Sequence, residues 1–139
     1  IAGFTLGTTA PMIYRALVES TAFGTKAIVD RYTEEGIRIE TVIGIGGIAL
    51  KSPFVMQTMS DVLGRPIKVS NTDQACALGA AMFAATAAGV YRTVEDAIAV
   101  MNSGFSKEYV PNPERTQAYA DLYKRYQSLG RFTEENLFR

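Results

Sequence analysis

The stretch TVIGIGGIALKSPF, residues 41–54, limits the possible folds more than any other part of the sequence. Its first half is short, apolar and rich in β-branched residues, which is typical of a buried parallel strand. Three glycines then fall within four positions, and Ser52 followed by Pro53 is a typical helix start. The stretch therefore predicts a strand, a tight glycine turn and a helix, an arrangement by which many proteins hold a nucleotide.

The flanking sequence extends this stretch into an α/β unit. The chain is predicted to begin with a helix over 9–35, capped by Thr8 or Thr9, followed by a strand over 40–45 and a helix from Ser52 to Gly64. A second strand over 67–70 comes next, and then a helix that Thr72 or Asp73 caps and that runs to Gly89. A shorter helix from Thr93, a loop over 102–112 and a helix over 113–128 complete the predicted order. Two strands joined by a helix predict a right-handed parallel crossover. Because two strands make a poor sheet, we expect further strands before residue 1 or from a partner chain.

The length of 139 residues corresponds to about one domain. We expect it to contain the long helix 9–35, a strand–turn–helix–strand–helix nucleotide unit over 40–89, and C-terminal helices over 93–129. The chain starts Ile-Ala-Gly-Phe, with neither an initiator methionine nor a secretory signal. The sequence is therefore expected to be a single-domain fragment of a longer protein.

Composition excludes several classes of function. The 14 basic and 14 acidic residues cancel, so no overall charge favours nucleic acid or an anionic membrane. The sequence has no histidine, which rules out Ser-His and Cys-His catalysis and histidine-ligated zinc within this chain. No apolar segment reaches the length of a membrane span. The single cysteine, Cys76, suits a reducing cytoplasm, and its alanine-rich surroundings predict a packed thiol instead of a nucleophile.

Two familiar phosphate-binding patterns nearly match the glycine turn. A Walker loop would need glycines at Ile45 and Leu50, counted back from Lys51, and neither position is glycine. The dinucleotide fingerprint Gly-x-Gly-x-x-Ala does fit 44–49. Against it, the predicted helix starts only at Ser52, and the second strand ends at Ser70 where an acidic residue would be expected.

Two readings of the turn stay open on the residues alone. In the first, the glycines only let the strand turn tightly against a small-residue helix. In the second, the bare Gly46–Gly47 backbone lets the ribose or α-phosphate of a nucleotide approach, while Lys51 or Ser52 supplies polar contacts.

Several longer motifs resemble a known family. They are FTLGTTAPMIYRALVES (4–20), GGIALKSPFVMQ (46–57), DVLGRPI (61–67), DQACALGAA (73–81) and YKRYQ (123–127). In this order they resemble the C-terminal domain of the FGGY carbohydrate kinases, the family of glycerol kinase, xylulokinase and ribulokinase, with the ribulokinase branch most similar. The resemblance covers nearly the whole chain.

The resemblance implies part of an actin-like (ribonuclease H-like) ATPase domain, helix-rich, with a short parallel strand pair and its upstream strands missing. It implies an ATP- and Mg²⁺-dependent kinase that phosphorylates a hydroxyl of a ketopentose such as L-ribulose. Gly46 and Gly47 would lie against the ADP moiety, and Ser52 or Lys51 would contact the adenosine. The sugar pocket and catalytic aspartate would belong to an N-terminal domain of the same polypeptide, so this fragment alone would be inactive.

The resemblance assigns no catalytic or metal-binding residue to this chain, and Asp61 and Asp73 are expected to be structural. It implies a cytoplasmic protein with a sugar substrate and without nucleic-acid or membrane partners, and it leaves a homodimer open. One alternative is a non-catalytic actin-like or Rossmann-like nucleotide-binding module. Another is an interaction domain that uses Tyr119, Tyr123 and Tyr126 as a partner surface, although this stripe is expected to pack against its own domain.

Overall fold

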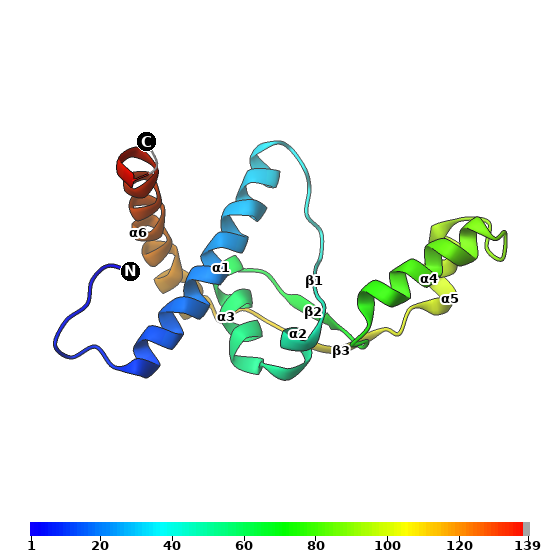
Figure 1. Ribbon diagram of the computed structural model, residues 1–139, viewed down its shortest axis with the longest axis horizontal. Helices are drawn as coiled ribbons and strands as arrows, with labels where there is room; N and C mark the ends of the chain where they lie inside the picture. The colour runs from blue at the N-terminus through cyan, green and yellow to red at the C-terminus, as the bar shows by residue number, and fades with distance from the viewer. Residues whose placement is uncertain (138–139) are drawn as a thin grey trace. The chain divides into compact units, whose positions relative to one another are not determined.

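The computed structural model describes residues 1–137 and contains a three-stranded sheet with helices (Figure 1). Its elements are α1 (Ala10–Glu34), β1 (Val42–Gly44), α2 (Gly47–Lys51), α3 (Pro53–Leu63), β2 (Ile67–Ser70), α4 (Ala75–Ala87), α5 (Val94–Met101), β3 (Phe105–Tyr109) and α6 (Pro113–Leu137). The chain divides into two compact units. Unit 1 comprises residues 1–40, 57–66 and those from Val110 onward, and unit 2 comprises 41–56 and 67–109.

The sheet belongs to unit 2 and has the order β1-β2-β3. β1 runs parallel to β2, with Val42 opposite Ile67, which confirms the predicted parallel pair. β2 is the central strand, and its Ile67 and Val69 are each 1% exposed. The fold class is therefore α/β, as the sequence predicted.

β3 corrects the prediction of a loop over 102–112. Residues 105–109 pair antiparallel with β2, with Ile67 opposite Tyr109, and the register is irregular between Val69 and Ser70. The sequence of β3, FSKEY, lacks an apolar run because four of its five residues are exposed. Charged residues of this kind are common on edge strands, where pairing rests on the backbone and not on a buried face.

Gly44 ends β1 at a crowded position in unit 2. A Cβ at residue 44 would lie 2.7 Å from the Cε atom of Met56 and 3.3 Å from the Cβ atom of Ala49. Real Cβ atoms do not approach other carbons as closely as the first of these distances. The Met56 contact is with the end of a flexible side chain, which can move, whereas Ala49 would have to give by a few tenths of an ångström. Glycine at this position therefore allows Ala49 to pack closely against the end of β1.

The core of unit 1 is an aromatic cluster between α1 and α6. Phe23 of α1 lies with its ring centroid 6.1 Å from that of Tyr119, 5.8 Å from Tyr123 and 5.4 Å from Tyr126. Ala22, Phe23, Tyr119 and Tyr123 are all buried. The tyrosine stripe thus packs against its own domain, as expected, which contradicts its alternative role as a partner surface.

Polar contacts join the rim of this cluster. The Tyr119 hydroxyl donates a hydrogen bond to Glu19 Oε1 at 3.0 Å, and Arg15 Nε donates to the same oxygen at 2.7 Å. Burial raises the pKa of the Tyr119 hydroxyl above its usual 10.0. The phenol therefore stays protonated and can donate to the Glu19 carboxylate at neutral pH.

Asp61 is a buried carboxylate that joins α3 to the start of α6. Its side chain is 2% exposed, and its Oδ1 accepts hydrogen bonds from Gln57 Nε2 and from the backbone N–H of Asn112, both at 2.8 Å. Arg115 Nη1 lies 3.5 Å from Oδ2. Gln57 Nε2 also donates to the Val110 carbonyl at 2.9 Å. The residue is structural, as expected, because its oxygens are occupied by the protein.

The helix ends confirm some predicted caps and correct others. Ser52 Oγ accepts from the Val55 N–H at 3.4 Å, and Thr93 Oγ1 accepts from the Asp96 N–H at 3.2 Å. The Thr72 or Asp73 cap was wrong, because α4 starts later, at Ala75, with Gln74 in the N-cap position. The last helix also runs beyond its predicted end at 128, since Gly130 is accommodated inside it.

Removal of the Phe23 ring should weaken unit 1 severely. We expect Phe23→Ala to lower the free energy of unfolding by about 3–5 kcal/mol, because the substitution leaves a cavity among three tyrosines. Phe132→Ala is the matched control, since Phe132 of α6 is 58% exposed and should change stability by no more than about 0.5 kcal/mol. Urea unfolding of the full-length polypeptide, followed by circular dichroism, measures both. Equal losses would show that the cluster is not the core of this unit.

Asp61→Ala should destabilise the protein by about 1–3 kcal/mol, because the N–H of Asn112 and a Gln57 amide hydrogen would be buried without acceptors. Asp61→Asn keeps one acceptor oxygen and should cost less. The control is Asp73→Ala, at an exposed position. The same unfolding measurement applies, and an Asp73 effect as large as that of Asp61 would contradict the structural role of the buried carboxylate.

Candidate nucleotide site

The two glycines of the turn occupy different backbone positions at the start of α2, the short helix labelled in Figure 1. Gly46 is the N-cap residue, with φ 85° and ψ 179°, a conformation that residues with a side chain rarely adopt. Gly47 is the first helical residue. A Cβ at either position would have no protein atom within 4 Å. The backbone at Gly46–Gly47 therefore faces open space that side chains do not fill.

The position of α2 corrects the sequence prediction. Helical backbone begins at Gly47, five residues before the predicted start at Ser52. A helix that opens within the glycine pattern is what the dinucleotide fingerprint requires, so this objection to the fingerprint was wrong. The other objection holds, because β2 ends at Ser70 and not at an acidic residue. Ile45 and Leu50 likewise still exclude a Walker loop.

The structure brings the four predicted site residues together on α2 and its ends. Gly46 and Ser52 are the residues that flank the helix, and Gly47 and Lys51 are its first and last residues. A helix of five residues is about 7.5 Å long, so all four lie within a short span. Gly47 and Lys51 are four residues apart and therefore lie on the same face of the helix.

The face shared by Gly47 and Lys51 is accessible, whereas Ala49 turns toward the protein and is 5% exposed. Helix side chains tilt toward the N-terminus, which directs the Lys51 stem back along the face that carries Gly47. Within residues 1–137 the Lys51 ammonium forms no ion pair, and the residue is exposed. A positive charge is thus available beside the bare glycine backbone.

Ser52 has a structural role as well as its predicted one. It ends α2, with its backbone N–H bonded to the Ile48 carbonyl at 2.9 Å, and its Oγ caps α3. The Ser52 hydroxyl already accepts a hydrogen bond from the Val55 N–H, but it can still donate its own proton to a ligand. Substitution of Ser52 would therefore disturb the helix start as well as any ligand contact.

Asp61 and Asp73, the two other polar residues considered from the sequence, both lie outside α2. Asp61 belongs to unit 1, where protein groups occupy its carboxylate. Asp73 lies in unit 2 but is exposed, in the connection between β2 and α4. In the described part of the chain, acidic and cysteine side chains do not gather into a group that could hold a metal ion. The site thus offers open backbone, one cation and one hydroxyl.

Across residues 1–137, none of the helices combines the length and the apolar character that a membrane span requires.

The prediction of a packed thiol at Cys76 was wrong, because this thiol is exposed. The short helix α2 is the feature that sequence reasoning missed at the site, and the signal for it was present, because Ile48, Ala49 and Leu50 directly follow the glycines.

Comparison with known proteins identifies the family. Residues 1–88 match the C-terminal domain of the FGGY family of carbohydrate kinases. A ribulokinase from Vibrio parahaemolyticus is 52% identical over 135 residues, which are 97% of this chain and 24% of that protein. A ribulokinase from Bacillus licheniformis is 45% identical over 91% of this chain and again 24% of that protein. The chain therefore spans about a quarter of the length of the curated relatives it matches.

Solved structures show the same fold. The xylulose kinase from Rhodospirillum rubrum superposes with a TM-score of 0.84 at 25% identity, over 99% of this chain and 28% of that one. A glycerol kinase from Plasmodium falciparum superposes with a TM-score of 0.68 at 24% identity, over 99% of this chain and 26% of that one. The fold is thus that of the actin-like ATPase domain of these kinases, and the chain belongs to the FGGY family of carbohydrate kinases, whose C-terminal domain it matches.

Proposed function

We propose that this chain is the ATP-binding C-terminal part of a cytoplasmic sugar kinase that transfers the γ-phosphoryl group of ATP to a hydroxyl of a ketopentose such as L-ribulose. The observation that carries the proposal is the 52% identity to a ribulokinase over 97% of the chain. The 135 matched residues make up nearly the whole chain, so the match includes the glycine turn. The N-terminal domain of the same polypeptide would supply the sugar pocket and the catalytic aspartate.

The geometry of α2 supports nucleotide binding by Gly46, Gly47, Lys51 and Ser52. Open space beside both glycines allows a flat or bulky group of the nucleotide to contact the backbone. The Lys51 ammonium can neutralise phosphate charge on the same helix face, as a mobile point charge. The Ser52 hydroxyl can donate one hydrogen bond to the adenosine.

Mg²⁺ would bind chiefly to the nucleotide phosphates and to residues outside the described part of the chain. Carboxylates are the usual protein ligands of Mg²⁺, and among residues 1–137 they form no cluster that fits the ion. When bound, Mg²⁺ would neutralise charge on the transferred phosphoryl group. We therefore assign neither a metal ligand nor a catalytic residue to this chain.

Sugar-dependent release of ADP tests the proposed reaction. The full-length protein, supplied with ATP and Mg²⁺, should release ADP when L-ribulose is added, with less activity on D-xylulose or glycerol. Residues 1–139 alone should release none, because the group that accepts the sugar proton is proposed to lie elsewhere. ATP binding by the full-length protein without release of ADP for any sugar would identify a non-catalytic nucleotide module. Activity of residues 1–139 alone would overturn the assignment of catalysis to the N-terminal domain.

Gly47→Val should raise the Michaelis constant for ATP in the full-length protein roughly tenfold to a hundredfold, since a branched side chain in ligand space costs about 1–3 kcal/mol. The Michaelis constant for the sugar should change little. Gly130→Val is the matched control, because Gly130 is also helical and also has no protein atom near the added Cβ. Equal changes for both substrates would point to misfolding and would remove Gly47 from the nucleotide site.

A further inference from the structure

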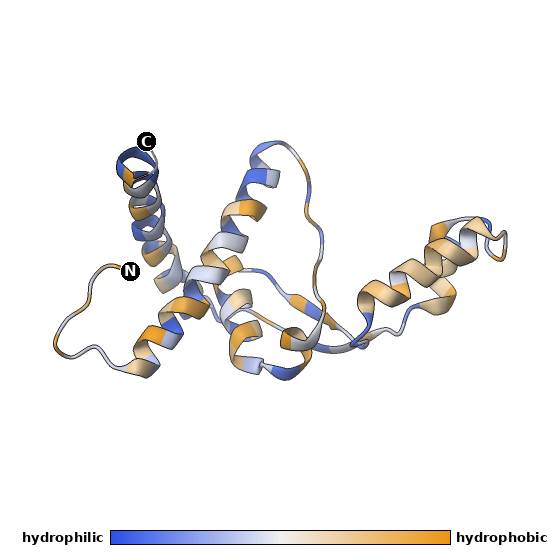
Figure 2. Ribbon diagram, viewed as in Figure 1, coloured by the Kyte–Doolittle hydropathy of each residue, from blue (hydrophilic) through white to orange (hydrophobic). Residues whose placement is uncertain are grey.

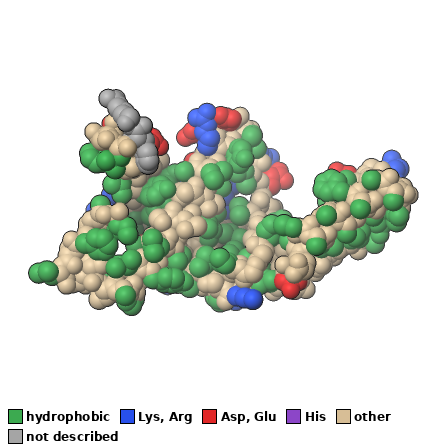
Figure 3. All heavy atoms as spheres, in the orientation of Figure 1, with side chains coloured by type: hydrophobic (Ala, Val, Ile, Leu, Met, Phe, Trp, Pro, Cys, Tyr) green, Lys and Arg blue, Asp and Glu red, His purple; other side chains and the backbone are tan. Residues whose placement is uncertain are grey.

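The hairpin formed by α4 and α5, residues 75–101, is rich in apolar residues. Figure 2 shows hydrophobic residues along both helices, and Figure 3 shows hydrophobic side chains along the hairpin, with charged side chains near the turn that joins the helices. The charged residues of this segment are Arg92, Glu95 and Asp96. The helix α4, ACALGAAMFAATA, carries none. A helix that is apolar on all sides is normally buried on all sides.

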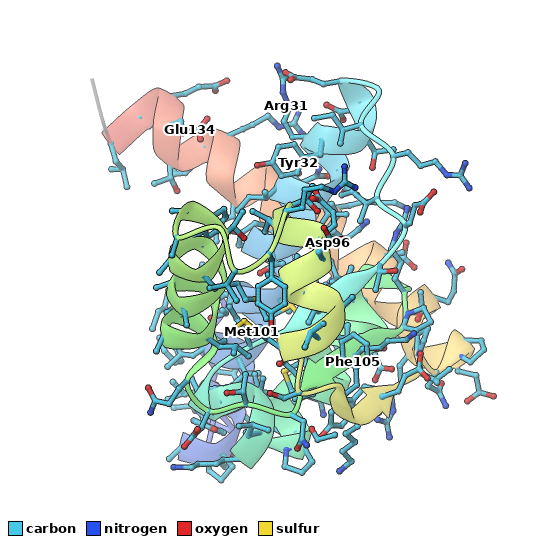
Figure 4. The ribbon with its side chains drawn as sticks, turned by 90° about the vertical axis from the view of Figure 1, so that its right-hand side faces the viewer. Arg31, Tyr32, Asp96, Met101, Phe105 and Glu134 are labelled. Carbon is cyan, nitrogen blue, oxygen red and sulfur yellow. The ribbon has the colours of Figure 1, made fainter. Side chains whose placement is uncertain are left out.

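The hairpin buries little of this apolar surface by itself. α4 and α5 lie side by side, as Figure 4 shows, and Met82 and Ala97 are their buried residues. Large side chains remain uncovered elsewhere on the hairpin. They are Phe83 at 64% exposure, Val90 at 68%, Ile98 at 44% and Val100 at 68%. Large apolar side chains exposed on an almost uncharged hairpin are typical of a surface that contacts other protein.

The sheet of the same unit is also incomplete along β1. β1 is one of the two edge strands and pairs with β2 alone among the described strands. Ile43 is 49% exposed and Ile45, just after the strand, is 58% exposed. Strands in parallel pairing are normally covered on both faces. Unit 2 therefore lacks a covering for its strand edge as well as for its helical hairpin.

We propose that the outer face of the α4–α5 hairpin is an intramolecular interface, covered in the full-length protein by polypeptide that precedes Ile1. The proposal rests on the proposed function in taking the chain as the C-terminal part of a longer kinase. Most of the length of the matched ribulokinases lies outside the matched part, which spans 24% of each of the two described above. The family match is to a C-terminal domain, so most of this additional polypeptide would come before residue 1.

A covering by the same polypeptide is favoured over one by a second copy for two physical reasons. Association within one chain proceeds at a high effective concentration and does not depend on the amount of protein. The preceding polypeptide is also synthesised first, so it is available when the uncharged hairpin emerges from the ribosome. A hairpin that had to wait for a second copy would expose aggregation-prone surface during folding.

Cys76 provides a probe for this face, because it is on α4 and its thiol is exposed in residues 1–137. In the native full-length protein we expect iodoacetamide to label Cys76 at least about tenfold more slowly than an exposed thiol, since a covered thiol reacts only after local opening. The matched control is the thiol introduced by Ala118→Cys, at an exposed position of α6. Peptide mapping by mass spectrometry measures both labelling rates in the same molecule.

Each outcome of the labelling has a distinct meaning. Protection of Cys76 that does not change on dilution supports the intramolecular interface. Equal labelling of both thiols overturns it, and protection that disappears on dilution overturns it in favour of a second copy. Failure of the kinase assay together with protection of Cys76 would remove the proposed function but keep the interface. An active kinase with a fully reactive Cys76 would keep the proposed function but remove the interface.

Discussion

The close packing of Ala49 on α2 against Gly44 at the end of β1 is the contact that positions the candidate site. Met56 of α3 and Ala49 of α2 would both crowd a Cβ at this position, and Met56 would come within 2.7 Å of it. With glycine there, Ala49 and the Met56 side chain can lie close to the end of the strand without displacement. Gly44 therefore has a packing role, whereas Gly46 provides a positive φ and Gly47 leaves open space beside the helix. The two open readings of the turn are thus compatible, because each applies to a different glycine.

A second constraint holds unit 1 together and is independent of the first. α3 starts in unit 2 and ends in unit 1, where Asp61 accepts hydrogen bonds from Gln57 and from the backbone of Asn112. Asn112 in turn caps α6 through its Oδ1, which accepts from the Arg115 N–H at 3.1 Å. One buried carboxylate thereby fixes where the last helix begins. The tyrosines of that helix can then meet Phe23 of α1 at regular helical spacing.

The sequence predicted those elements whose signal is local. The long helix α1, the parallel strand pair and the caps Ser52 and Thr93 each depend on periodicity or on residues within four positions of one another. β3 escaped prediction because it is held by pairing with β2, more than thirty residues away in sequence, and its own residues are mostly exposed and polar. α2 was not predicted, because the strong capping signal at Ser52 and Pro53 was taken as the start of the first helix after the strand. For the candidate site, residue types and the family resemblance predicted four positions, whose contact with a nucleotide stays a prediction. The open space beside Gly46 and Gly47 depends on tertiary packing, so the sequence could not predict it.

The incorrect prediction for Cys76 has a physical explanation in the proposed interface. Burial was inferred from composition, because a segment as rich in alanine and as poor in charge as α4 is normally surrounded by protein. Residues 1–137 surround only part of that helix, so its thiol is exposed in them. The proposed interface would cover this face of α4 in the full-length protein, and it would account both for the uncharged composition of the helix and for the exposure of its thiol in residues 1–137.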